Sequence, residues 1–121
     1  MESSTRALLV IRHDIDGSVD KNDFDDWYFN EHFADNLRCP GFLAASRFEI
    51  APGSQGASDG LQGYLTIWEL EGEDALHTPE YQKRRENPTE RTKKMRPVMR
   101  NLVRGVYVRM EPREPAAEVS E

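Results

Sequence analysis

The chain has 121 residues, of which 37% are hydrophobic and 31% charged, with a formal net charge of −6. This composition is typical of one globular domain with a modest core. It argues against nucleic-acid binding, which depends on a basic surface for phosphate contacts, because the basic clusters at 83–85 and 91–96 alternate with Glu80, Glu86 and Glu90.

Other protein classes are also disfavoured. No apolar run approaches the ~20 residues that span a membrane, and the start, MESSTRALLV, lacks the apolar region of a signal peptide. A cytoplasmic protein without membrane contact is therefore expected. Cys39 is the single cysteine, so a disulfide framework and a cysteine zinc site are both excluded. The three histidines are scattered, and no metal site is predicted.

The first elements are a strand and a long helix. Residues 1–6 are polar and expected to fray. Residues 7–15, ALLVIRHDI, predict a strand buried on both faces. Asp20 is a suitable N-cap for a helix over residues 21–37. Pro40-Gly41 ends that helix.

The first predicted helix carries a carboxylate within its apolar stripe. On an ideal helix Glu31 falls in the middle of the stripe that Phe24 and Trp27 define, and His32 falls at its edge. A carboxylate on a buried face is costly unless it has a partner or a function. Glu31 is therefore expected to meet an arginine in a structural ion pair, with Arg12 or Arg47 as the partner, or to meet a histidine in a proton-transfer site.

Two further strands are predicted over residues 42–50 and 63–70, joined by a loop rich in Gly, Ser and Pro that could be mobile or cover a site. Alternation puts Phe42 and Phe48 on one face of the second strand. In the third strand Tyr64 and Trp68 share a face with Thr66.

The last third of the chain predicts helix and then strand. Thr78-Pro79 begins one helix and Thr89 caps another, which Pro97 should kink or divide. The buried stripe of this second helix is expected to comprise Met95, Val98, Met99 and Leu102. Residues 103–110 predict the last strand. Residues 112–121 predict a disordered tail, which leaves 7–111 as the folded domain.

The order β-α-β-β-α-β predicts an α+β, ferredoxin-like fold with a four-stranded antiparallel sheet. The two helices cover one face of that sheet and leave the other uncovered, yet the first strand is apolar on both faces and the second offers apolar side chains to both. An exposed apolar face of this size is unexpected on a monomer, so a homodimer through the sheet faces is predicted. Phe29 and Phe33, on the back of the first helix, suggest a further contact with the tail or the partner.

A family resemblance follows from these residues. The motif W-Y-x-x-E-H (Trp27, Tyr28, Glu31, His32), followed by Pro40-Gly41-Phe42, resembles the dimeric α/β-barrel superfamily, and its EthD-like branch in particular. The segment Tyr64 to Leu70 with Leu76, Thr78, Pro79 and Tyr81 is similar to that branch as well. The superfamily includes isomerases, cyclases, dehydratases and monooxygenases, many of which need no cofactor. The resemblance implies a cleft beneath the first helix, with Trp27 and His32 at the site.

The candidate site residues are those that could converge in such a cleft. A histidine can take up and return a proton near neutral pH, and a neighbouring carboxylate would orient its ring and raise its pKa. The candidate catalytic residues are therefore His32, Glu31, His13 and Tyr64. The candidate substrate-binding residues are Trp27, Tyr28, Trp68 and Arg12, although Arg12 and His13 point to opposite faces of their strand. Aromatic walls would suit a flat, hydrophobic substrate.

The sequence thus predicts a cofactor-independent isomerase, lyase or cyclase that shifts protons on a hydrophobic, aromatic or polyketide-like small molecule. One alternative is a monooxygenase that uses oxygen directly or through haem, because Trp68 and His77 faintly resemble haem-degrading members; an exposed loop position for His77 is favoured over that role. Another is a non-catalytic binding or accessory subunit. Each candidate side chain also has a purely structural interpretation, as a core residue, a cap or an ion pair.

Overall fold

The computed structural model describes residues 4–54, 61–110 and 114–117. Four strands form one antiparallel sheet in the order β2-β3-β1-β4. The elements in chain order are β1 (Ala7–Ile15), α1 (Lys21–Trp27), η1 (Tyr28–His32), α2 (Phe33–Leu37), β2 (Phe42–Glu49), β3 (Tyr64–Leu70), η2 (Glu73–His77), α3 (Pro79–Glu86), α4 (Glu90–Met95), η3 (Arg96–Val98) and β4 (Met99–Val108).

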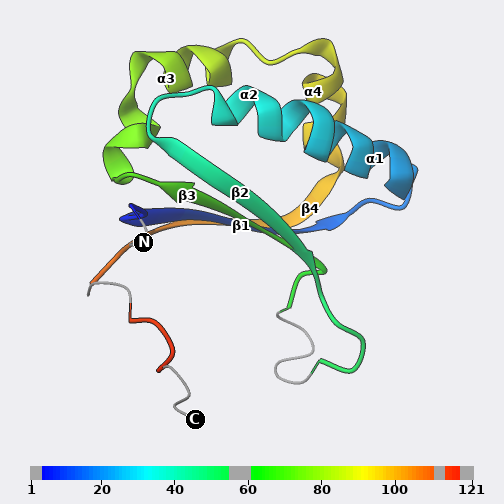
Figure 1. Cartoon of the computed structure of the whole chain (residues 1–121). Coiled ribbons are helices and arrows are strands. Elements are labelled where there is room, and N and C mark those ends of the chain that lie inside the picture. The colour runs from blue at the N-terminus through cyan, green and yellow to red at the C-terminus, as the bar shows by residue number, and fades with distance from the viewer. Residues whose placement is uncertain (1–3, 55–60, 111–113, 118–121) are drawn as a thin grey trace.

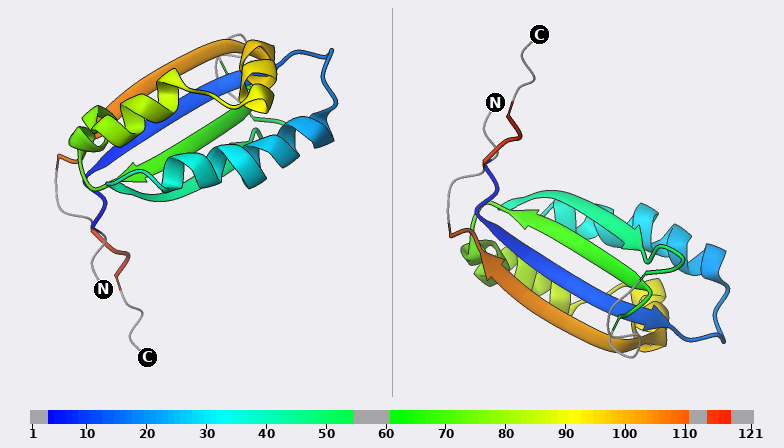
Figure 2. Two further views of the ribbon diagram at one scale, coloured as in Figure 1. Left: turned by 90° about the horizontal axis from the view of Figure 1, so that it is seen from above. Right: turned by 90° about the horizontal axis from the view of Figure 1, so that it is seen from below.

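The described helices all lie over one face of the sheet, and the view from below shows the other face without a helix (Figures 1 and 2). This arrangement confirms the predicted ferredoxin-like fold. Parts of the expected frayed start and disordered tail lie outside the described residues. At the start, Thr5 and Arg6 are nevertheless held: the Arg6 amide donates to the Leu70 carbonyl at 2.9 Å, and Thr5 Oγ1 donates to Glu69 at 2.9 Å.

The first helix departs from the ideal geometry at its centre. Asp20 caps it as predicted, but residues Tyr28–His32 form a π-helical turn between α1 and α2. A π turn holds one residue more than an α turn, so it shifts the phase of every residue after it. His32 therefore takes the position in the apolar stripe that an uninterrupted helix would give to Glu31.

The facing of β2 also differs from simple alternation. A register shift between Phe42 and Ala44 places an extra residue against β3, as a β-bulge does. Beyond it, Arg47 pairs with Thr66 and Phe48 with Leu65. Phe42 thus lies on the helix-covered face in the core, whereas Phe48 lies on the uncovered face with 50% of its surface exposed. The prediction that the two rings share a face was wrong.

The last strand begins earlier than expected. Thr78 and Thr89 cap α3 and α4 as predicted, but Pro97 ends the helical segment as the short turn η3. Met99 already pairs with Ile15 of β1, and the Asp16 amide donates to the Val98 carbonyl at 2.8 Å. Leu102 is consequently a strand residue rather than part of a buried helical stripe, and half of its surface is exposed.

The core between sheet and helices is aromatic. Its least exposed side chains include Phe24, Trp27, Tyr28 and Trp68. Gly41 makes the turn from α2 into β2 with a φ of +87°, and a Cβ at this position would lie 2.7 Å from Ala75 Cβ. Only glycine satisfies both conditions without strain. Within the described segments, none of the helices is both long and apolar enough to cross a membrane.

Candidate functional site

A cleft of about 300 Å³ lies between the sheet and the helices. Its floor comes from β1 and β3, and its walls come from the first helix, from α3 and η3, and from β4. The lining side chains are Leu9, Ile11, Tyr28, His32, Asn36, Trp68, Tyr81, Arg84, Arg85, Arg96, Met99, Leu102 and Arg104. A cleft of this size with apolar walls and a few convergent polar groups is the usual form of a small-molecule site.

The histidine that lines the cleft is His32. Its ring stacks on Trp27, with centroids 4.8 Å apart, and meets the edge of Trp68 at 5.5 Å. Arg84 Nη2 lies 3.3 Å from His32 Nδ1. Burial, followed by the charges of Arg84 and Arg96, lowers the pKa of His32 from 6.5 to about 3.

These contacts determine the protonation of the ring. A guanidinium nitrogen can only donate, so Nδ1 of His32 accepts and the ring proton resides on Nε2. With its pKa lowered, His32 is neutral at pH 7 and offers an N–H donor. A neutral imidazole held in this form can polarise a substrate carbonyl or donate to a developing oxyanion.

The Glu31 carboxylate is bound to α4 rather than to His32. It accepts from Thr89 Oγ1 at 2.9 Å and from Thr92 Oγ1 at 3.4 Å, while Thr89 Oγ1 accepts the Thr92 amide at 3.2 Å. Glu31 thus fastens the π turn to the first turn of α4. The expected pairing of Glu31 with a histidine or an arginine was wrong, and Arg84 stands beside His32 where a carboxylate was expected.

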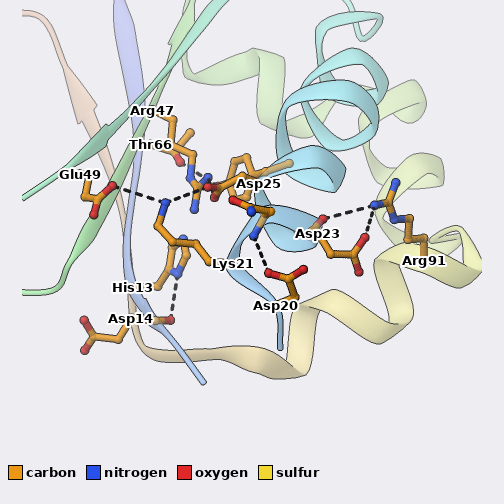
Figure 3. A network of polar contacts seen from close by, with 12 residues as sticks. His13, Asp14, Asp20, Lys21, Asp23, Asp25, Arg47, Glu49, Thr66 and Arg91 are labelled. Atoms are coloured by element: carbon orange, nitrogen blue, oxygen red, sulfur yellow. Dashed lines mark hydrogen bonds and ion pairs between the residues drawn. The ribbon is translucent and has the colours of Figure 1, made fainter. Parts of the chain in front are cut away.

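His13 belongs to a neighbouring buried cluster rather than to the cleft lining. It lies on the helix-covered face of β1, donates from Nδ1 to the Asp14 carbonyl at 3.0 Å, and stacks near Tyr64 at 5.6 Å. Figure 3 shows this cluster with Arg47, which pairs with Asp25. Lys21 joins the same network through Asp25 at 2.9 Å and Glu49 at 3.6 Å (Figure 3).

The cluster is a cationic, aromatic stack. The Arg47 guanidinium lies 4.5 Å from the centroid of Tyr28 and 4.9 Å from that of Tyr64. Within the described part of the chain, Nε and Nη2 of Arg47 and Nε2 of His13 are buried without a hydrogen-bond partner. Burial is the main cause of the lowered His13 pKa, and Arg47 lowers it further. Tyr28, whose hydroxyl accepts from Thr66 at 2.8 Å, separates this cluster from His32.

The cleft therefore brings together three of the predicted site residues, His32, Tyr28 and Trp68. Trp27 is a core residue that packs behind His32 and donates from Nε1 to Thr92 at 3.1 Å. Arg12 is exposed on the uncovered face of the sheet, so its predicted contribution to the cleft was wrong. His77 is exposed on η2 and is not among the lining residues.

The cleft also contains residues that sequence reasoning missed, above all its four arginines. Arg84 and Arg85 belong to the basic cluster at 83–85, which the glutamates around it set aside as a nucleic-acid surface, and no role at the site was predicted for them. Arg104 stands between Leu102 and Val106 in a strand whose alternation places all three on the same face. That alternation was the one available signal. In the three described segments, no group of three or more His, Cys, Asp or Glu side chains is placed to hold a metal ion.

Comparison with known proteins supports the fold. No protein-family model matches the sequence, and no curated protein matches it. Among solved structures, an EthD family protein from Bacillus halodurans aligns with 87% of this chain and 99% of its own at a TM-score of 0.56 and 17% identity. A hydroxynitrile lyase from Passiflora edulis aligns with 93% of this chain and 100% of its own at a TM-score of 0.64 and 10% identity.

A third similar structure is a monooxygenase from Streptomyces coelicolor in complex with nanaomycin D, which aligns with 93% of this chain and 95% of its own at a TM-score of 0.61 and 15% identity. Proteins from Thermobifida fusca and an uncultured marine organism with the same fold are described as dimeric and ferredoxin-like. These structures confirm the ferredoxin-like fold that the resemblance implied.

Proposed function

We propose that this protein is a small-molecule enzyme that needs no cofactor and promotes proton transfer on a hydrophobic, ring-bearing substrate in the cleft. The observation that carries the proposal is the position of the His32 imidazole, which is fixed between Trp27 and Trp68 in the lining of an apolar-walled cleft. The reaction class is isomerase, lyase or cyclase, and the substrate is aromatic or polyketide-like.

His32 acts as the donor to the substrate oxygen. Its Nε2–H donates to the carbonyl oxygen of the bound ketone and stabilises the enolate that forms when a neighbouring C–H loses its proton to solvent. Arg84 keeps the ring in this tautomer through Nδ1. Enolate formation is common to isomerisation, retro-aldol cleavage and ring closure, so one donor can serve any of these reactions. Removing one such donor typically costs a factor of about 10²–10³ in rate.

Hydrogen–deuterium exchange tests this role without knowledge of the natural substrate. Fused-ring ketones such as 2-tetralone are incubated with the protein in D₂O, and the initial rate of deuterium incorporation next to the carbonyl is followed by NMR. The wild type should accelerate exchange, and His32→Gln should remove about 99% or more of that acceleration. His77→Gln changes an exposed histidine outside the cleft and should behave as wild type. Equal rates for His32→Gln and wild type would contradict the assignment.

A direct oxygenase is the second candidate, because this fold is shared with a cofactor-independent oxygenase from Streptomyces nogalater and with the monooxygenase described above. The same enolate would then react with O₂. An oxygen electrode distinguishes the two, since an oxygenase consumes O₂ in proportion to substrate and a proton-transfer enzyme does not. The haem version has no support from His77, which is exposed outside the cleft lining. A non-catalytic subunit would bind such ketones without exchange or oxygen uptake.

The proposed assembly is a homodimer that buries the uncovered faces of two sheets against each other. Apolar side chains of all four strands lie on that face, among them Val10, Phe48, Ile67 and Tyr107. Half or more of the surface of Phe48 and Tyr107 is exposed in the single chain. A contiguous apolar face of this kind marks an interaction surface. Dimeric proteins of the same fold support a second copy of the chain as the partner that covers it.

A further inference from the structure

The cleft concentrates positive charge in an acidic protein. Arg84 and Arg85 enter it from α3, Arg96 from η3 and Arg104 from β4, and the described side chains that line it include no aspartate or glutamate. The chain as a whole carries a net charge of −6. The positive cleft is therefore a local feature of the fold rather than a consequence of a basic composition.

Several arginines elsewhere in the described structure are matched with acids. Arg91 lies 2.8 Å from Asp23 and 3.0 Å from Asp26, Arg100 pairs with Asp16, and the buried Arg47 pairs with Asp25. Among the described residues no carboxylate lies within 4.0 Å of Arg85, Arg96 or Arg104. Arg84 reaches only Asp35, at 3.9 Å.

The surroundings of Arg84 and Arg96 indicate that the cleft lacks negative charge. The Arg84 side chain is only 14% exposed. It donates from Nη2 to His32, but its Nε is buried without a hydrogen-bond partner in the described structure. Burial, together with the charges of Arg84 and Arg85, lowers the pKa of Arg96. A buried cation with little counter-charge is costly. Arg84 has one carboxylate, at 3.9 Å, and the half-buried Arg96 has none in the described structure, so an anion placed between them would relieve that cost.

We propose that the substrate of this cleft is an organic acid whose carboxylate is bound by Arg84 and Arg96, with Arg104 at the edge, while its ring lies against Trp68, Leu9 and Ile11. The proposal deepens the proposed function and rests on the same cleft. A guanidinium presents paired donors that match a carboxylate, and such charge-assisted bonds are about twice as strong as neutral ones. A neutral ligand would contact only the apolar lining, and an inorganic anion would contact only the arginines, whereas an organic acid would contact both.

The bound carboxylate also affects the catalytic group. Arg84 contacts both His32 and the proposed anion position, so the carboxylate would be held beside the imidazole. The substrate oxygen that receives the Nε2–H would then lie on the same ring system as the carboxylate. Arg84 and Arg96 thus act as specificity-determining residues, which choose acids over their neutral analogues.

Matched ligands test this inference without turnover. Calorimetric titrations at fixed ionic strength compare 1-naphthoate with 1-naphthamide, which has the same ring and nearly the same shape but no charge. The wild type should bind the acid at least about tenfold more tightly, since a hydrogen bond to a charged group contributes roughly 1.5–3 kcal/mol. Equal affinities would overturn the proposal.

Substitutions of single arginines test which side chains cause the preference for naphthoate over naphthamide. Arg96→Gln should lose most of the preference for the acid and leave naphthamide affinity unchanged, and Arg104→Gln, at an exposed strand position, should reduce the preference several-fold without any risk to the core. Arg100→Gln, whose side chain pairs with Asp16 outside the cleft, is the matched control and should retain the full preference. A preference that survives both Arg96→Gln and Arg104→Gln would contradict the proposed site.

The two proposals fail separately. His32→Gln should keep the preference for the acid while losing deuterium exchange. If the wild type prefers naphthoate but exchanges no ketone proton, the anion site stands and proton transfer fails. If exchange depends on His32 while acid and amide bind equally, proton transfer stands and the anion site fails.

Discussion

His32 is kept neutral by burial and by two arginines, and this has a consequence for stability. The pKa of His32 falls from 6.5 to about 3 on folding, and that of His13 is also lowered. Between the folded and unfolded pKa values the unfolded chain binds more protons, so these histidines stabilise the fold fully above pH 6.5 and lose that contribution as the pH falls.

Urea unfolding between pH 7 and pH 4.5 measures this effect. The free energy of unfolding should decrease toward acid, by up to about 1.4 kcal/mol per pH unit for each histidine. His32→Gln should flatten the slope relative to wild type. Asp14, whose pKa is lowered from 3.8, contributes nearer pH 4 and below. A slope that is the same in His32→Gln and wild type would contradict the neutral, buried ring.

Glu31 has a structural role in this geometry, because its partners are the hydroxyls of Thr89 and Thr92. Glu31→Ala should lower the free energy of unfolding by about 1 kcal/mol through the loss of these hydrogen bonds. Glu31→Gln keeps an acceptor oxygen and should lose less. Both variants should retain deuterium exchange at 25 °C. If Glu31→Gln were as stable as wild type and yet as inactive as His32→Gln, Glu31 would be part of the proton-transfer machinery.

At the scale of the elements, the turn from α2 into β2 depends on a single glycine. Gly41→Ala combines a φ of +87° with a Cβ contact of 2.7 Å to Ala75, so it should destabilise the fold by about 2 kcal/mol or more. Gly17 also lies in a turn, but a Cβ there would meet no atom within 4 Å. Gly17→Ala is therefore the control, and chemical denaturation of the two variants gives the comparison. Equal stabilities would contradict the close approach of the two backbones.

The elements also show where sequence reasoning is reliable. The first strand, the caps Asp20, Thr78 and Thr89, and the stop at Pro40-Gly41 are local signals, and each was confirmed. The π turn and the bulge in β2 result from packing between elements, so no local sequence pattern predicted them. Each shifts the phase by one residue, which was enough to exchange the predicted environments of Glu31 and His32 and to separate Phe42 from Phe48.

The arginines of the cleft were missed for a related reason. Arg84, Arg96 and Arg104 come from three elements, and only the tertiary fold brings them to one place. In the sequence, Arg84 stands among other charged residues, whereas Arg104 lies between apolar residues of a strand, and no local pattern relates these positions to one another. His32 could be named from its helix motif, whereas the charge that surrounds it could not.

At the scale of the whole molecule, the uncovered sheet face tests the proposed dimer. Val10 lies on that face in a central strand, so Val10→Glu should yield a monomer at tens of micromolar, where the wild type should be dimeric by light scattering. Phe29→Glu changes a ring on the back of the first helix that is 48% exposed, and it should remain dimeric. A monomeric wild type, or dissociation by Phe29→Glu alone, would contradict assembly through the sheet faces.

The central claim is that the neutral His32 and the arginines that line its cleft together form an anion-binding proton-transfer site. NMR titration of the His32 ring, with and without saturating 1-naphthoate, tests it most directly. The charged and titratable groups that influence the ring are Arg84 from α3, Arg96 from η3 and His13 from β1. In the free protein His32 should remain neutral at pH 5, and naphthoate should raise its pKa by offsetting both arginines. An imidazolium at pH 5 in the free protein, or a pKa that naphthoate leaves unchanged, would contradict the claim.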